Sequence, residues 1–256
     1  MAYARDRIQG SRPGDSGAAP AAIIEHPDVR RMLLRMTALT QGARTLLYYT
    51  AGQIDRGTIG DATAAARAEV LVPLLKAWGT DIGVEVASLG VQIHGGMGFV
   101  EETGAAQHYR DARIAPIYEG TNGIQAADLV TRKLGLENGE VMLGLIADIA
   151  READGVPPLQ ALARDCRSVA EWLHDEASID DRLAGSVPFC TMLAVAVAGW
   201  QLLRQLRSFE GDVPVAKQAS VSFFIDRLVP EASGLMPGAT AGAAGLYAVS
   251  AEQLVG

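Results

Sequence analysis

Apolar side chains recur every three or four residues along almost the whole chain, which is the spacing of one face of an α-helix. The first apolar stripe starts after His26 and stops near Gly57 and Gly60, so it predicts a single long helix. Pro27 and Asp28 suit the first turn of that helix, because proline fits the first helical position and a carboxylate favours the positive end of the helix dipole. The stripe consists of Val29, Met32, Leu33, Met36, Leu39, Ala43, Leu46, Leu47 and Thr50.

A second apolar stripe predicts another long helix, from about Asp61 to Gly95-Gly96. Pro73 lies inside it and must either kink the helix or restart it. Shorter helices are expected over residues 102–111 and 123–134, and no segment shows the alternation of a strand. Four helices joined by short loops predict an all-α, up-down four-helix bundle over residues 1–135.

Two glycines and an asparagine between Lys133 and Gly139 mark a turn or linker after the bundle. A second helical module is predicted beyond it, over residues 140–256, with an apolar stripe of its own. Its helices are expected at 140–151, 158–177, 180–207 and 215–229, with a last one at 239–253 in a tail rich in glycine and alanine.

The stretch Val187–Leu203 carries no charge and invites comparison with a membrane span. It is shorter than the roughly 20 apolar residues that cross a bilayer, and Pro188, Gly199 and Gln201 interrupt it. We expect a buried central helix there and no membrane span.

The composition of the chain argues against some classes of binding partner. Of its 256 residues 49% are hydrophobic, and the net charge of −8 argues against nucleic-acid or anionic-membrane partners, which favour clustered Lys and Arg. The only cysteines are Cys166 and Cys190, and the first residues contain no apolar signal core. We therefore expect a cytoplasmic protein.

The chemistry is concentrated in residues 92–125. There Glu119 lies in a glycine-flanked turn just before a helix start, about twenty residues after the turn of Gly95, Gly96 and Gly98. Glycine-rich turns next to a helix start let the backbone close around a flat or phosphorylated ligand. This run resembles the carboxy-terminal signature of the acyl-CoA dehydrogenases. Residues 3–10, Tyr-Ala-Arg-Asp-Arg-Ile-Gln-Gly, resemble the segment with which that family leaves the first helix of its carboxy-terminal bundle, which would place Met1 inside that helix.

The resemblance implies a role for each matching residue. Glu119 matches the catalytic base of the family, and its backbone N–H matches a donor to the thioester oxygen. Gln92, Gly95 and Gly96 match positions against the ADP half of the FAD of a neighbouring subunit. Arg7 matches the arginine that reaches the flavin pyrophosphate, and Thr121 matches a further flavin contact. Gly123 stands where members often have glutamine, so that contact would be absent or would fall to Asn122 or Gln125.

The resemblance also implies the setting of the reaction. It covers only the carboxy-terminal half of the family, and is closest to larger bacterial members with an extra helical domain, such as the methylthiopropionyl-CoA dehydrogenase group. The substrate would be an acyl-CoA, the acceptor an electron-transfer flavoprotein and the assembly a dimer or tetramer. The amino-terminal and middle domains have no counterpart in these residues, so we expect the chain to be inactive alone, unless a separate chain supplies that half.

Two other interpretations stay open. A carboxylate metal site in a bundle needs two Glu-x-x-His pairs, but the chain offers only Glu171 and His174, so no metal is expected. A catalytically silent remnant or assembly subunit would also fit half of an enzyme, and a gene for the other half would argue against it. His94 and His108 are expected to serve packing or hydrogen bonding, and Arg110, Asp111 and Arg113 to form a charge cluster that holds the loop before Glu119.

Overall fold

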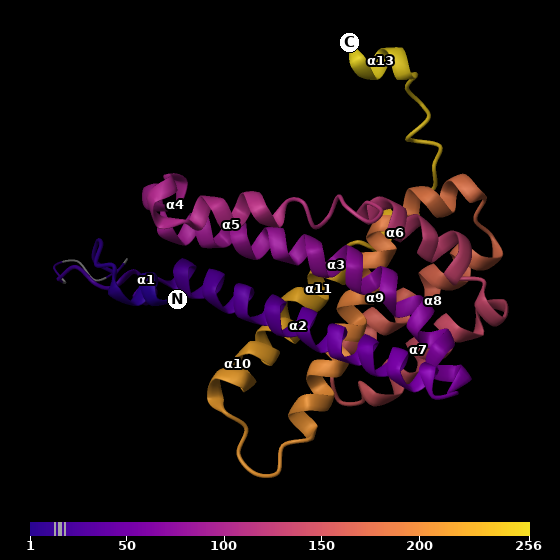
Figure 1. Ribbon diagram of the computed structural model, residues 1–256, viewed down its shortest axis with the longest axis horizontal. Coiled ribbons are helices and arrows are strands. Elements are labelled where there is room, and N and C mark those ends of the chain that lie inside the picture. Colours follow the sequence, from indigo (N-terminus) through magenta and orange to yellow (C-terminus); the bar gives the residue numbers. More distant parts are fainter. Residues whose placement is uncertain (13, 15–16, 18) are drawn as a thin grey trace.

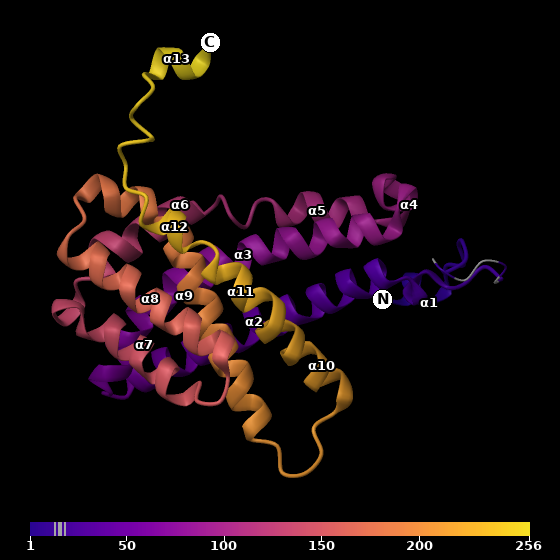
Figure 2. The same cartoon turned by 180° about the vertical axis from the view of Figure 1, so that it is seen from behind.

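The computed structural model describes residues 1–256 except 13, 15, 16 and 18, and the described part is all-α, as predicted. Its only strand-like pairing is an isolated bridge between Ile8 and Ala22. Figures 1 and 2 show a helical body from which the carboxy-terminal tail projects. The helices are α1 (Ala2–Asp6), α2 (Pro27–Thr58), α3 (Ala62–His94), α4 (Gly96–Phe99), α5 (Ala105–Ala112), α6 (Asn122–Asp128), α7 (Glu140–Glu152), α8 (Pro157–Asp175), α9 (Ile179–Arg207), α10 (Val215–Phe223), α11 (Val229–Ser233), α12 (Met236–Ala239) and α13 (Ala251–Val255).

The two long helices α2 and α3 form an antiparallel pair, as the two stripes predict (Figure 1). The turn between them is short because Gly60 takes a left-handed conformation and Asp61 caps the next helix, accepting a hydrogen bond of 3.0 Å from the Ala64 N–H. Gly57 keeps the two helices close there, since a Cβ on it would lie 3.0 Å from that of Ala65. α3 continues through Pro73 as one helix.

The two shorter helices of the bundle both pack on α3, at different points along it. α5 accompanies the part of α3 that leads to α4, whereas α6 lies nearer the second half of the chain (Figure 1). The segment between α5 and α6 therefore runs along α3, and it carries Glu119. A π-helix, Leu129–Lys133, follows α6 and leads to the predicted turn.

The second half packs on the first half through α9, which contacts α2, α3 and α6 as well as α8 and α12. By length and composition α9 could cross a membrane, but 72% of its most apolar window is buried inside the protein. The expected central helix over residues 187–203 is thus confirmed. One large core cluster includes side chains from both halves, among them Leu46, Leu74, Leu129, Met142, Leu145, Phe189, Trp200 and Phe224.

The connection between the halves is a tight turn. Glu137, Asn138 and Gly139 all have positive φ angles, which ends the preceding helical segment and starts α7. Because the core runs across this turn, the packing does not give each half a core of its own. A domain boundary between residues 135 and 140 remains a prediction.

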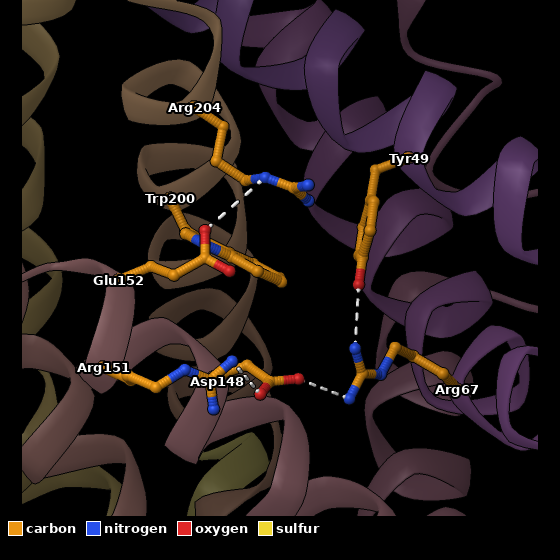
Figure 3. Close-up of polar contacts among 7 residues, drawn as sticks. All are labelled: Tyr49, Arg67, Asp148, Arg151, Glu152, Trp200 and Arg204. Carbon is orange, nitrogen blue, oxygen red and sulfur yellow. Dashed lines mark hydrogen bonds and ion pairs between the residues drawn. The ribbon is translucent and has the colours of Figure 1, made fainter. Parts of the chain in front are cut away.

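Polar groups also join the halves at the edge of this core, where α2, α3, α7 and α9 meet (Figure 3). Arg67 of α3 donates to Tyr49 Oη at 3.2 Å and to Asp148 Oδ2 of α7 at 2.7 Å. Glu152 of α7 accepts a 2.8 Å hydrogen bond from Trp200 Nε1 of α9. About a fifth of the Arg67 and Asp148 side chains is exposed, so this pair is shielded from most of the solvent.

The helix expected over residues 239–253 is wrong. α12 ends at Ala239, and residues 240–250 form turns before the short α13. Gly242 has a positive φ, and the next N–H, of Ala243, donates to Asp181 Oδ1 at 2.7 Å instead of continuing a helix. Ser250 then starts α13 with a capping box. The alanine content favoured a helix, but the glycines and this side-chain contact outweighed it.

Candidate functional site

Glu119 lies in the turn that joins α5 to α6, and its backbone has a left-handed conformation that is uncommon for a residue other than glycine. Its φ is +53° and that of Gly120 is +82°, so two successive residues are left-handed. A residue with a Cβ costs about 1–3 kcal/mol in such a region and persists there only when its neighbours hold it. The Glu119 side chain is exposed and forms no hydrogen bond or ion pair with the described residues. Its carboxylate is therefore available for chemistry.

Residues after Glu119 start α6 and fix the turn on that side. Thr121 is the N-cap, and its Oγ1 accepts a 3.3 Å hydrogen bond from the Ile124 N–H. Gln125 Nε2 donates to the Glu119 carbonyl at 3.4 Å. Asn122 and Gln125 are the two candidates for the flavin contact that a glutamine at position 123 often makes in the family. Gln125 contacts the backbone of the turn, whereas Asn122 points toward α3.

Lys76 and Asn122 together fasten the turn to the middle of α3. Lys76 Nζ donates to the Gly120 carbonyl at 2.6 Å and to Asn122 Oδ1 at 2.9 Å. Asn122 Nδ2 lies within hydrogen-bond distance of the Ala77 carbonyl, Thr80 Oγ1 and Asp81 Oδ1. Sequence reasoning missed Lys76; the only available signal was a lysine among the apolar positions of a helix.

Asp81 also belongs to this polar cluster, through its hydrogen bond with Asn122. Desolvation raises the pKa of the Asp81 carboxyl, although the Asn122 hydrogen bond and the charges of Arg113 and Lys76 act in the opposite direction. Of the charge cluster expected before Glu119, Arg113 thus acts on Asp81 through its charge. Arg110 instead forms a two-pronged ion pair with Glu101, at 2.7 and 2.9 Å.

Exposed apolar side chains lie close to Glu119 in the sequence. Ile114, Ile117, Tyr118 and Ile124 are each between 51% and 61% exposed. Isolated apolar side chains are ordinary on a protein surface, but four exposed ones within five positions of Glu119 put apolar surface on the segment that carries this free carboxylate. A ligand or another protein segment that packed on this segment would shield it from water.

Arg7 and Gly95 lie together at the far end of α3. They line one cavity of about 300 Å³ with Tyr3, Gln9, Ile23, His26, Val29, Ile93 and His94. Arg7 Nη2 donates to Gln9 Oε1 at 3.3 Å, and both side chains are exposed. Tyr3 stacks on His94 with ring centres 4.2 Å apart, while His94 Nδ1 is 2.7 Å from the Gly90 carbonyl. The packing role expected of His94 is confirmed.

The glycines of this end differ in what they do. Gly95 has a φ of +60°, and a Cβ on Gly95 or Gly96 would meet no atom of the described residues within 4 Å, so the backbone of both is open to a ligand. Gly98 is a packing glycine, because a Cβ there would lie 2.2 Å from the Val91 carbonyl oxygen. Gln92, exposed in the last turn of α3, accepts the Gly95 N–H at its carbonyl at 3.0 Å.

The predicted site residues therefore form two groups. Glu119 and Thr121 lie beside the middle of α3, near Lys76, and Arg7, Gln92, Gly95 and Gly96 lie at its end. At 1.5 Å per residue, the nineteen residues from Lys76 to Gly95 correspond to a separation of roughly 28 Å along the helix. One copy of the chain does not bring the two groups to one ligand.

Other candidate groups have structural partners. Glu171 pairs with Arg167 at 2.8 Å and His174 with Asp175 at 2.6 Å, and the described residues contain no cluster of three potential metal ligands. Cys166 and Cys190 are buried free thiols, and burial raises the pKa of both, that of Cys190 to about 12. At neutral pH they stay protonated and behave as small apolar side chains.

Two family models match the chain. "Acyl-CoA dehydrogenase, C-terminal domain" matches residues 2–134, and "Acetyl-CoA dehydrogenase C-terminal like" matches residues 142–250. Among curated proteins, the chain is 46% identical over 244 residues to 3-methylmercaptopropionyl-CoA dehydrogenase of Ruegeria pomeroyi, covering 87% of this chain and 40% of that protein. It is 29% identical to a broad-specificity linear acyl-CoA dehydrogenase of Mycobacterium tuberculosis, covering 90% of this chain and 44% of that protein.

Solved structures share the fold. An acyl-CoA dehydrogenase from Bacillus anthracis, complexed with FAD, superposes with a TM-score of 0.70 at 21% identity, over 93% of this chain and 44% of that one. ACDH-11 of Caenorhabditis elegans, complexed with C11-CoA, superposes with a TM-score of 0.68 at 18% identity, over 89% and 39% of the two chains. The chain thus spans less than half the length of the proteins that it resembles here.

Proposed function

This chain belongs to the acyl-CoA dehydrogenase family, and from that premise we propose that it is the carboxy-terminal part of an enzyme that desaturates an acyl-CoA thioester at its α and β carbons. The observation that carries the proposal is the turn at Glu119, where a free, exposed carboxylate stands on a strained backbone, in a segment with exposed apolar side chains. That arrangement suits a base that works once a partner surface excludes water.

In the proposed reaction Glu119 removes a proton from the carbon next to the thioester carbonyl. The proton moves to a Glu119 carboxylate oxygen, and the Glu119 N–H donates to the thioester oxygen, which makes the proton more acidic. In the left-handed conformation of Glu119 and Gly120 no described acceptor takes that N–H, so it is available for this contact. FAD, when bound, would supply the acceptor for the hydride that leaves the β carbon.

The residues at the end of α3 fit a phosphate-bearing group such as the flavin pyrophosphate. The Arg7 guanidinium is exposed beside a cavity and, among the described residues, is hydrogen-bonded only to a neutral amide, so its fork can bind an oxyanion. Gly95 and Gly96 leave open space where other residues would carry a Cβ. Arg7, Gln92, Gly95 and Gly96 would hold the ADP half of the cofactor, and Thr121 would contact the flavin near Glu119.

The separation of these two groups supports a shared cofactor site in an oligomer. If each flavin lies between subunits, Glu119 serves one cofactor and Arg7 another, which agrees with their distance along α3. We propose a dimer or tetramer that passes electrons to an electron-transfer flavoprotein. We also propose that the chain alone binds little FAD and has no activity, because the exposed turn at Glu119 then stays open to water.

A completed enzyme tests this function. The chain would be joined in frame to the preceding part of the 46%-identical relative, or to the segment encoded upstream of Met1, and assayed for dye reduction with acyl-CoA thioesters. We expect a yellow oligomer that reduces the dye with at least one acyl-CoA, whereas the chain alone stays colourless. A yellow oligomer that binds acyl-CoA but reduces no dye with any acyl-CoA would favour the silent assembly subunit.

A further inference from the structure

We propose that Lys76 and Asn122 are positioning residues that hold Glu119 in its reactive conformation. This inference rests on the proposed function, because it concerns the same carboxylate. Neither residue reaches the Glu119 side chain; both act on the backbone on its carboxy-terminal side.

Lys76 holds the turn through two hydrogen bonds, and we call these bonds and those of Asn122 the clamp. Its ammonium donates to the Gly120 carbonyl, directly after Glu119, and to Asn122 Oδ1, at the start of α6. Both acceptors are neutral oxygens, and no ion pair between Lys76 and Glu119 is present in the part of the chain that the structure describes. The lysine thus fixes the turn without occupying the carboxylate that has to take up a proton.

Asn122 ties the same turn to a turn of α3 that includes Ala77 and Thr80. Its Nδ2 is 2.9 Å from the Ala77 carbonyl and 2.9 Å from Thr80 Oγ1, and its Oδ1 accepts from Lys76. Its backbone N–H donates to the Pro116 carbonyl at 3.0 Å, which closes the loop of residues 116–122 on itself. One asparagine therefore fixes both the shape of the loop and its place on the helix.

The clamp is needed because Glu119 does not favour its own conformation. A non-glycine residue with φ near +53° relaxes unless flanking contacts hold it, and the Glu119 side chain forms no hydrogen bond or ion pair with the described residues that could do so. Lys76 and Asn122 fix Gly120 and the start of α6, so they supply that constraint. Without them the carboxylate would sample several positions, and a misplacement of about 1 Å can cost about a hundredfold in rate.

The first test uses the chain alone and needs no activity. Backbone hydrogen exchange would be measured for Lys76→Met and Asn122→Ala, with the backbone amide at position 122 as the reporter of the loop. We expect exchange of that amide to rise at least about tenfold, since its bond to Pro116 opens with the loop, while amides of α9 keep their protection. Lys217→Met is the matched control, because Lys217 also donates to two amide oxygens, of Gln41 and Gln205, but far along the chain.

The second test uses the completed enzyme. Asn122→Ala and Lys76→Met should lower kcat about tenfold or more, leave KM nearly unchanged and retain FAD, and Lys76→Arg should recover most of the rate because it keeps donors to both oxygens. Unchanged loop exchange, or an unchanged kcat in an enzyme that Glu119→Gln disables, would overturn the positioning role. An unchanged rate in Glu119→Gln would instead overturn the proposed function, so the two failures are distinct.

Discussion

Backbone conformation at single residues decides how the turn around Glu119 presents its carboxylate. Glycine at 120 permits the left-handed step, but Glu119 adopts the same region at a cost, which the contacts from α3 offset. The resemblance and the glycine-flanked turn predict Glu119 as a site residue from sequence. Its strained φ and the clamp by Lys76 could not be predicted, because they depend on which helix lies beneath the loop.

A glycine at the end of α3 gives a direct test at the residue scale. Gly98→Ala should destabilise the chain by about 1–3 kcal/mol, since its Cβ would lie 2.2 Å from a backbone oxygen that cannot move aside. Gly96→Ala is the control, because a Cβ there meets nothing within 4 Å, and it should change stability by less than about 0.5 kcal/mol. Urea unfolding of both variants measures the difference; equal midpoints would contradict this packing at Gly98.

At the scale of elements, the helix bounds show which features can be predicted from the sequence. The starts of α2 and α3 were predicted well because Pro27 and Asp61 are local signals that act within one turn. The break in the helix expected over residues 239–253 could not be predicted, because the Asp181 contact that holds Ala243 joins residues 62 positions apart. Such long-range contacts leave no local pattern in the sequence.

The pair Arg67 and Asp148 makes the packing of α3 on α7 depend on pH. Burial disfavours the charge on Asp148, but hydrogen bonds from Arg67 and Arg151 outweigh it and hold the pKa of this carboxyl below its ordinary value. A lowered pKa in the folded state stabilises the protein above the unfolded pKa of about 3.9, and that contribution is lost as the pH falls through the folded value. Asp148→Asn should therefore cost about 2 kcal/mol at pH 7 and progressively less below pH 4.

The measurement is urea unfolding of wild type and Asp148→Asn between pH 7 and pH 3. Asp226→Asn, at an exposed carboxylate with no ion pair among the described residues, serves as the control. A cost for Asp148→Asn that stays constant over this range would mean that the ion pair contributes nothing to stability.

At the scale of the whole molecule, α9 joins two segments that two different family models match. Its side chains Phe189 and Trp200 belong to the same core cluster as Leu46 and Leu74 of the first half. The apolar stripes predicted that each half is helical, yet they could not show that the stripes face one another. The same limit applies to the two groups of the candidate site, whose spacing along α3 emerged only from the fold.

Limited proteolysis can show whether the turn at residues 135–139 divides only the chain or also divides the hydrophobic core. Glu137 and Asn138 are exposed and left-handed, so we expect a first cut in the body near residues 135–139. Because the core crosses this turn, the two fragments should elute together in gel filtration and separate only in denaturant. Fragments that separate under native conditions would show that each half holds a core of its own.

The catalytic role of Glu119 is the central claim, and rapid mixing of the completed enzyme with acyl-CoA tests it most directly. Glu119→Gln keeps nearly the same shape and should retain fold, FAD and substrate binding, but it removes the base, which typically contributes about 10²–10⁴-fold. Flavin bleaching should therefore slow by at least about a hundredfold, while Glu102→Gln, at another exposed carboxylate, bleaches at the wild-type rate. A Glu119→Gln enzyme that bleaches as fast as wild type would remove Glu119 from the reaction.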